Sequence, residues 1–254
     1  MRWCLVALVL SVPSLVSAQR LQWQEDWRRA DWIDATVIGL GFATTLTVAL
    51  AVNDDTPRWD ARGPVDAAML ATRTPSATRR RRLSLTSDML MIASAAFGPV
   101  FLEPFVAWTD HRGFAGQLAV TTLRSYAVAT AVLTTLKYGL RRRRPPCDPD
   151  VGPEPCRESD ANRSFPSGHT TMAFTAAALS CTAHRHAPIY GESQVGGAVA
   201  CGALTAVATT TALLRLFARR HHVSDVVVGA LVGIASGWLL PLLASYGGFG
   251  GTRR

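Results

Sequence analysis

Lysine is almost missing from this chain: Lys137 is the single lysine among 26 basic residues, and all the others are arginine. The sequence also lacks an internal repeat, a His/Asp/Glu cluster at metal-binding spacing, and a basic helix with interleaved aromatic residues. The absence of a metal-binding cluster argues against a metal centre. The absence of such a basic helix argues against nucleic-acid binding, despite the net charge of +8. The arginines instead form short runs beside apolar blocks, such as Arg79–Arg82 and Arg141–Arg144, which is typical of charges that flank a membrane or contact phosphate.

Cysteine is scarce, with five residues in 254. Cys181 and Cys201 fall inside apolar segments, where a free cysteine behaves as a small hydrophobe, so we expect both to be unpaired. Cys147 and Cys156 flank a polar, proline-rich loop. They fit either two unpaired thiols or a disulfide, and a disulfide would need an oxidising compartment.

The first 18 residues have the pattern of a secretory signal peptide. Met1-Arg2-Trp3 is a short positive region, residues 4–16 are apolar, and Ala18 precedes a suitable cleavage point. An uncleaved membrane anchor is the alternative. With a cleaved leader, residues 19–254 form a single membrane-embedded domain.

Apolar residues make up 48% of the chain and are gathered in blocks of about twenty, the length that crosses a hydrocarbon core of about 30 Å. These blocks predict an all-α integral membrane bundle of about six helices, rich in small residues that allow close packing. The expected spans are 33–52, 89–108, 119–137, 168–183, 195–216 and 226–246. Pro99, Pro104 and Pro241 should kink or end their helices. Residues 19–31, with Trp23 and Trp27, suit a segment at the membrane interface.

Two long connections, 53–87 and 141–165, carry most of the polar residues. Two spans separate them, so they should lie on the same side of the membrane. Arg79–Arg82 indicates the cytoplasm by the positive-inside rule, whereas a Cys147–Cys156 disulfide would indicate the outside. Counting charges therefore leaves the orientation open.

The most informative polar segment is Arg215-x5-His221-x3-Asp225. On a helix Asp225 would share a face with His221, so its carboxylate could hold one ring nitrogen and leave the other free as a nucleophile. Arg215 is six residues before His221, a rotation of about 240° on one helix, so their convergence requires a helix break. His222 is the rival nucleophile, but the spacing to Arg215 favours His221.

A second segment, Pro166-Ser167-Gly168-His169, opens an apolar helix. The N–H groups of a first helical turn and the Ser167 hydroxyl can cradle an anion, and Gly168 lets a ligand approach the backbone closely. His169 at the rim could then give a proton to a leaving group. An ordinary capped helix with a surface histidine is the alternative interpretation.

The third segment is Lys137-x6-Arg144-Pro145. Seven residues are two helical turns, so both cations can point one way, with Pro145-Pro146 ending the helix. Two fixed cations neutralise a multiply charged phosphate, and Arg144 adds a two-pronged hydrogen-bond donor. Alone, the pair would also suit membrane-interface anchors.

In order and spacing, the three segments resemble the motifs of the type 2 phosphatidic acid phosphatase superfamily: Lys-x6-Arg-Pro, Pro-Ser-Gly-His and Ser-Arg-x5-His-x3-Asp. The one departure is Leu214 in place of the serine before Arg215. The resemblance implies His221 as a nucleophile that forms a phosphohistidine, Asp225 as its orienting group and His169 as the general acid. It assigns phosphate binding to Lys137, Arg144, Ser167, Gly168 and Arg215.

By this resemblance the protein is a metal-independent membrane phosphatase that needs no cofactor and cleaves a lipid phosphomonoester or pyrophosphate. It would span the inner cell membrane several times, with an extracytoplasmic active site. Its partners would be a phosphorylated lipid and the bilayer, and no nucleic acid. The same superfamily offers two alternatives, a secreted soluble acid phosphatase and a longer, soluble vanadium-dependent haloperoxidase. From another class, a non-catalytic membrane protein could bind lipid phosphate, although its signature would be the loss of a histidine.

Overall fold

The computed structural model describes residues 21–52, 56–147, 161–191 and 193–247. Within these ranges the chain is helical, and an isolated bridge between Trp59 and Arg142 is the one β contact among the described residues. The all-α prediction is therefore confirmed. The expected signal peptide and Cys156 lie outside the described residues.

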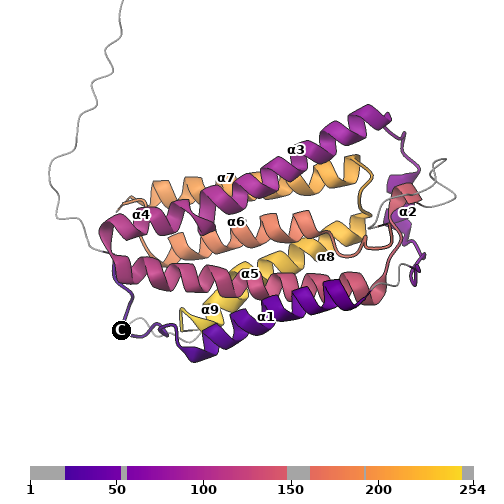
Figure 1. The fold of residues 1–254 in the computed structure, drawn as a ribbon. Coiled ribbons are helices and arrows are strands. Elements are labelled where there is room, and N and C mark those ends of the chain that lie inside the picture. The colour runs from indigo at the N-terminus through magenta and orange to yellow at the C-terminus, as the bar shows by residue number, and fades with distance from the viewer. Residues whose placement is uncertain (1–20, 53–55, 148–160, 192, 248–254) are drawn as a thin grey trace, which may run out of the picture.

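Long helices run along one another in a bundle (Figure 1). In chain order they are α1 (Trp32–Ala51), α3 (Ala77–Ala95) continuing through η1 (Ala96–Val100) into α4 (Leu102–Asp110), α5 (Arg112–Leu140), α6 (Gly168–His186), α7 (Gln194–Phe217), and α8 (Val223–Ile234) continuing through η3 (Ala235–Leu239) into α9 (Leu240–Ala244). The short α2 (Pro64–Leu70) and the 3-10 helix η2 (Pro145–Cys147) are the other helices of the described ranges. In the centre, α6 packs against α3, α5, α7 and α8.

The distribution of side chains is that of a membrane protein. Buried positions on α6 are small or weakly polar, such as Ala173, Thr175 and Ala177, whereas large apolar side chains such as Leu46, Met89 and Leu231 are exposed on the outer helices. Small residues allow close helix approach where lipid gives no hydrophobic driving force between helices. Among the residues that the structure describes, four segments are long and apolar enough to cross a membrane: α1, α3 through α4, α7, and α8 through α9. The expected spans around α5 and α6 are helical as well, but more polar and enclosed.

The second expected span begins earlier than predicted. The sequence suggested a connection up to residue 87, but α3 starts at Ala77, where the Ser76 side chain accepts from the N–H of Arg79. Arginine is a good helix former, so the Arg79–Arg82 run extends the helix. Pro99 lies in η1 beside Gly98, whose backbone is not helical, so the predicted kink is confirmed there.

Trp23 and Trp27 are buried against Phe114 and Tyr246 at one end of the bundle, and their place at a membrane interface stays a prediction. One expectation away from the three motifs was wrong. Cys181 and Cys201 are not free thiols: they form a disulfide between α6 and α7, with Cα atoms 4.6 Å apart. Spacing along each helix could not show that these two antiparallel neighbours bring the cysteines together. The Cys147–Cys156 alternative stays a prediction.

Candidate active site

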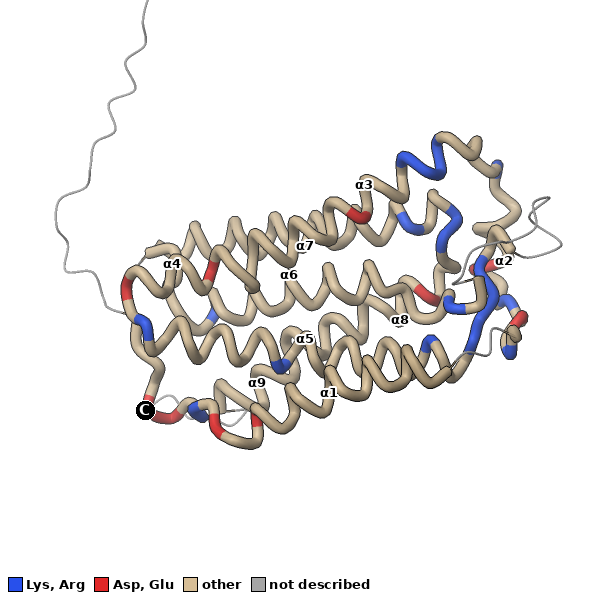
Figure 2. The backbone as a smooth tube through the Cα atoms, viewed as in Figure 1, with Lys and Arg blue, Asp and Glu red and all other residues tan. Residues whose placement is uncertain are grey.

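The three sequence segments meet at one end of the bundle. Figure 2 shows Lys and Arg gathered at the end that carries α2, the beginning of α3 and the beginning of α8. The first connection folds onto the second here, where the N–H of Arg58 donates to the carbonyl of Arg141 at 3.2 Å. The prediction that the two connections lie on the same side is therefore confirmed.

His221 is buried in the turn between α7 and α8, and its two nitrogens have different partners. Nδ1 lies 2.8 Å from the carbonyl oxygen of Ser164, which can only accept, so Nδ1 carries a hydrogen. Nε2 lies 3.4 Å from the Arg144 guanidinium. Burial lowers the pKa of His221 well below its ordinary value, and the charges of Arg144 and Lys137 act in the same direction. The ring is thus neutral, with the lone pair of Nε2 facing the cations.

The predicted helix break between Arg215 and His221 is present. α7 ends at Phe217, and Arg219 takes a left-handed conformation with φ 58° before α8 begins at Val223. His221 therefore precedes the helix, so the predicted shared helical face with Asp225 was wrong. The turn nevertheless brings the two side chains within 3.6 Å of each other.

His222 points elsewhere. Its Nε2 lies 3.2 Å from the carbonyl of Arg143, and its backbone N–H donates to Asp225 at 2.9 Å. As the residue before α8, it helps to start that helix and does not face Arg144. The geometry favours His221 over its neighbour.

Asp225 is fully buried and is held by several donors. Its Oδ2 accepts from the Ser164 hydroxyl at 2.5 Å, and its Oδ1 accepts from Arg142 at 2.5 Å. At 3.6 Å from Asp225, His221 Nδ1 is too far away for a direct hydrogen bond. Ser164 links the two because its hydroxyl donates to Asp225 while its carbonyl accepts from His221.

Arg142 connects Asp225 to residues in the N-terminal half of the chain. Its guanidinium bridges Asp225 and Asp66 of α2, the second at 2.7 Å, and stacks 4.3 Å from the centre of the Trp59 ring. Hydrogen bonds from Ser224 and Arg142 hold the pKa of the Asp66 carboxyl below its ordinary value, against the opposing effect of burial. Removing one member of such a buried pair leaves the other charge uncompensated.

Lys137 and Arg144 converge, but not by the predicted route. α5 ends at Leu140, and Arg141 is left-handed with φ 46°, so Arg144 is not on the helix and Pro145 does not end it. The chain instead turns and brings Arg144 to the carbonyl of Arg220 at 2.9 Å. Lys137, in the last turn of α5, donates to the carbonyl of Arg163 at 2.9 Å.

The beginning of α6 lies among these groups. Ser167 is buried at the N-cap position, and its hydroxyl is 2.9 Å from that of Thr170 and does not cap the helix. A Cβ built on Gly168 would lie 3.6 Å from Cε of Lys137, which places the lysine side chain beside this first turn. A helix N-terminus with an adjacent lysine is suited to binding an anion.

His169 and Arg215 share one carboxylate that the sequence did not single out. Asp88 of α3 lies 2.8 Å from His169 Nε2 and 2.8 Å from Arg215 Nη1. Arg215 also donates to the hydroxyls of Ser84 and Ser87, at 2.9 and 3.1 Å. Ser84, Ser87 and Asp88 lie on one face of α3, just before the helix becomes apolar. This polar stripe is the sequence signal that could have identified Asp88 as a site residue. No comparable pattern in the sequence distinguished Arg142 or Asp66 from the other charged residues near them.

Glycines on α8 allow this helix to pack closely against the beginning of α6. A Cβ on Gly229 would lie 2.7 Å from the carbonyl of Ser167, and one on Gly233 would lie 2.5 Å from that of Thr171. This contact lets the N–H of Ser167 donate to the carbonyl of Asp225 at 2.9 Å. Close helix packing thus sets the position of the anion cradle relative to the histidine turn.

The sequence of the chain is similar to those of known proteins. A stretch of 146 residues is 32% identical to the lipid A 1-phosphatase of Porphyromonas gingivalis, covering 54% of this chain and 28% of that protein. The matched region is thus well under half of that relative's length. No solved structure matches the chain. The family model of the PAP2 superfamily matches residues 117–248, which include all eight predicted site residues and just over half of the chain. The protein belongs to the PAP2 superfamily.

Proposed function

We propose that this protein is an integral membrane phosphatase that hydrolyses a lipid phosphomonoester or pyrophosphate through a phosphohistidine on His221. The observation that carries the proposal is the state of the His221 ring. Its Nδ1 hydrogen is held by Ser164, and its Nε2 faces Arg144 beside the α6 N-terminus. A neutral imidazole aimed at a cluster of cations is arranged for attack on a bound phosphoryl group.

In the first step, Nε2 of His221 attacks phosphorus, and the bond from phosphorus to the leaving oxygen breaks. The leaving oxygen takes a proton from His169. In the second step, His169 removes a proton from water, which attacks the phosphohistidine and releases inorganic phosphate and neutral His221. Both histidines then have their starting protonation.

The charge that develops on the phosphoryl oxygens would be stabilised by Lys137, Arg144 and Arg215 with the first turn of α6. Such preorganised donors commonly supply the largest part of catalysis in phosphoryl transfer. Since these groups provide the positive charge, we expect the reaction to proceed without a metal, to survive EDTA, and to be inhibited by vanadate.

Asp88 adds a positioning role to this scheme. Burial and the charges of Arg215, Lys137 and Arg144 disfavour the protonated form of His169, and the Asp88 carboxylate is the group that favours this form, which a general acid requires. One N–H of the imidazolium is held by Asp88, so the other is the proton available to the leaving group. The same carboxylate fixes Arg215 where it can meet phosphate.

The membrane-spanning helices and the P. gingivalis relative support a lipid as the substrate. The site lies at the end of the bundle, the level at which lipid headgroups meet helix ends. We further propose that the protein is located in the inner cell membrane with this end outside the cytoplasm, and that residues 1–18 are a leader.

Phosphate release in detergent from phosphatidate, phosphatidylglycerophosphate, a polyprenyl pyrophosphate and lipid A tests the function. We expect turnover of at least one lipid by the wild type, with and without EDTA, and none by His221→Ala. Equal release by both proteins, or activity lost on chelation and restored by magnesium, would contradict the mechanism.

A further inference from the structure

Asp66 lies in α2, outside residues 117–248 that the PAP2 family model matches, yet its carboxylate is buried at the active-site end of the bundle. The donors that hold it belong to the matched region. Its Oδ1 accepts from the N–H of Ser224 at 2.9 Å, and its Oδ2 accepts from the Ser224 hydroxyl and from Arg142, each at 2.7 Å. A residue that the motifs do not include thus contacts the residue directly before Asp225.

Arg142 connects this carboxylate to that of Asp225. One terminal nitrogen of its guanidinium lies 2.7 Å from Asp66, the other lies 2.5 Å from Asp225, and the residue is 1% exposed. The Trp59 ring lies against the face of the guanidinium. Because a guanidinium is planar and donates in fixed directions, the place of Asp66 sets the direction from which Arg142 holds Asp225.

The place of Asp225 in turn sets that of His221. Its Oδ2 accepts from the hydroxyl of Ser164, whose carbonyl accepts from Nδ1 of His221. The same oxygen accepts from the backbone N–H of His222, the next residue of the turn. A displacement of Asp225 would therefore reach the imidazole through Ser164 and through the backbone.

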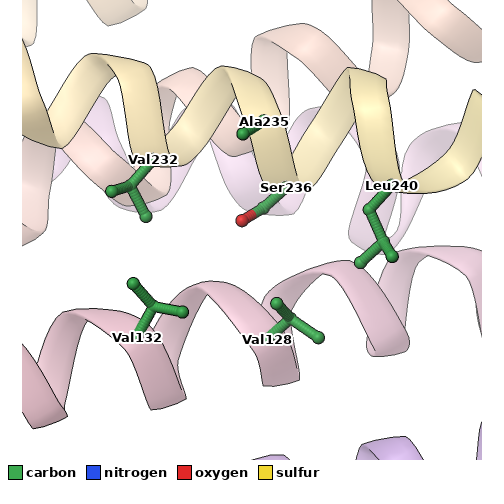
Figure 3. Close-up of a pocket in the computed structure, with 6 residues that line it drawn as sticks. All are labelled: Val128, Val132, Val232, Ala235, Ser236 and Leu240. Carbon is green, nitrogen blue, oxygen red and sulfur yellow. The ribbon is translucent and has the colours of Figure 1, made fainter.

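Apolar packing between α5 and α8 leaves part of this arrangement to polar contacts. A gap of about 200 Å³ separates α5 from the rod formed by α8, η3 and α9 (Figure 3). It is lined by six residues of these elements: Val128, Val132, Val232, Ala235, Ser236 and Leu240. At the charged end, residues 142–144 contact residues 220–225 directly. The position of Asp225 relative to Arg144 therefore depends on these polar contacts as well as on packing against α6.

From these contacts we propose that Asp66 is a positioning residue of the reaction: it orients Arg142, which fixes Asp225 and so keeps His221 aligned with the bound phosphoryl group. The proposal rests on the proposed function and adds to it a residue of the first connection. Asp66 is not one of the phosphate-binding residues. Its loss should slow attack by His221 and leave the binding of phosphate nearly unchanged, whereas a merely structural role would weaken both together.

The first test compares two anions on the Asp66→Asn protein. Asparagine keeps the size of the side chain and can still accept from the Ser224 N–H, but it removes the charge that orients Arg142. Vanadate resembles the pentacoordinate transition state and bonds to the nucleophile, so its dissociation constant should rise about tenfold. The dissociation constant of inorganic phosphate should change less than threefold. Calorimetry in detergent measures both without turnover, and equal weakening of the two anions would overturn the proposal.

The rate of the first chemical step should follow vanadate. The burst of phosphoenzyme formation from p-nitrophenyl phosphate should be about tenfold to a hundredfold slower in Asp66→Asn, since misplacement by about 1 Å can cost a hundredfold in rate. Asp60→Asn is the matched control, because Asp60 lies in the same connection and pairs with Arg143, but is 59% exposed. It should keep the wild-type burst and both dissociation constants. A wild-type burst in Asp66→Asn would contradict the positioning role.

A double variant tests whether Asp66 acts through Arg142. In an Arg142→Met protein this link is already broken, so adding Asp66→Asn should slow the burst by less than threefold. A full repetition of the loss seen in the single variant would show another route and would overturn the proposal.

Arg142→Lys provides a second variant that does not depend on the folding of Asp66→Asn. Lysine keeps the charge but lacks the fixed directions of the guanidinium, so it should weaken vanadate about tenfold and phosphate less than threefold. Wild-type affinity for vanadate in this protein would also contradict the proposal. Failure of the wild type to bind vanadate or to hydrolyse p-nitrophenyl phosphate would instead contradict the proposed function, and this inference with it.

Discussion

At the scale of single side chains, catalysis depends on which histidine is neutral and which is protonated. His221 is buried beside cations and has its pKa lowered, whereas His169 is only partly buried and has the Asp88 carboxylate as its neighbour. Asp88 favours the protonated form of His169, whereas burial and the charges of Arg215, Lys137 and Arg144 oppose it. We assign the neutral His221 as the nucleophile and His169, paired with Asp88, as the acid. The assignment agrees with the roles that the motifs imply.

The lowered pKa of His221 predicts a pH dependence for the first chemical step. An ordinary histidine with a pKa of about 6.5 would lose its neutral form about threefold between pH 7 and 6. His221 stays neutral above its lower pKa, so phosphoenzyme formation from p-nitrophenyl phosphate should change less than twofold over this interval. That substrate needs little protonation by His169. A burst measured by rapid quench would show this, and a threefold fall would contradict it.

Replacing Asp88 by Asn should lower kcat/KM for an alkyl phosphate by roughly tenfold to a hundredfold, because His169 loses the charge that favours its acid form. The loss should be smaller with p-nitrophenyl phosphate, whose leaving group needs little protonation. Steady-state kinetics with both esters would measure the difference. Asp60→Asn is the matched control, since Asp60 is 59% exposed and pairs with Arg143 at the surface. Equal losses on both esters would indicate a structural role alone.

At the scale of helices, the contact between α6 and α8 sets the site geometry. Gly233→Ala should cost about 1–3 kcal/mol of unfolding free energy, because its Cβ would collide with the Thr171 carbonyl. The helices can relieve that collision only by moving apart, so activity should fall as well.

Gly202→Ala on α7 is the control for this substitution, since no atom lies within 4 Å of its added Cβ. Alanine is also the better helix former, so this variant should lose no stability. Denaturant unfolding in detergent would compare the two proteins. Equal unfolding free energies for the two variants would contradict the role of the close contact between α6 and α8 in stability.

The helices also show what the sequence could and could not predict. Motif spacing identified residues that do meet at one end, because each motif lies at a helix end or in a short turn. It could not predict that α5 ends at Leu140, since this depends on the left-handed Arg141. It also missed Asp88, Arg142 and Asp66. Their partners are 76 to 127 residues away in the chain, beyond the reach of local periodicity.

At the scale of the whole molecule, Lys and Arg are concentrated at one end of the bundle (Figure 2), and many large apolar side chains are exposed on its outer helices. A bilayer explains both features, since it surrounds the apolar faces and leaves the charged end at its surface. The N-terminal half supplies more than anchoring spans, because α2 and α3 bring Asp66 and Asp88 to the motif residues. The bundle is therefore needed to complete the site.

The orientation of this end can be measured with cysteine chemistry. We expect Cys147 and Cys156 to be labelled by a membrane-impermeant maleimide in intact cells after treatment with an impermeant reductant. A variant with Cys4, Cys181 and Cys201 replaced by serine keeps the signal specific to the loop. Labelling that appears only after lysis would place the active site in the cytoplasm.

The most direct test of the account is to trap the covalent intermediate. Rapid quenching of the purified protein with a 32P-labelled substrate should yield an acid-labile, base-stable phosphoenzyme in the wild type and in His222→Ala. His221→Ala should yield none and lose several orders of magnitude in turnover. A phosphoenzyme that persists in His221→Ala and disappears in His222→Ala would show that the nucleophile has been assigned to the wrong histidine.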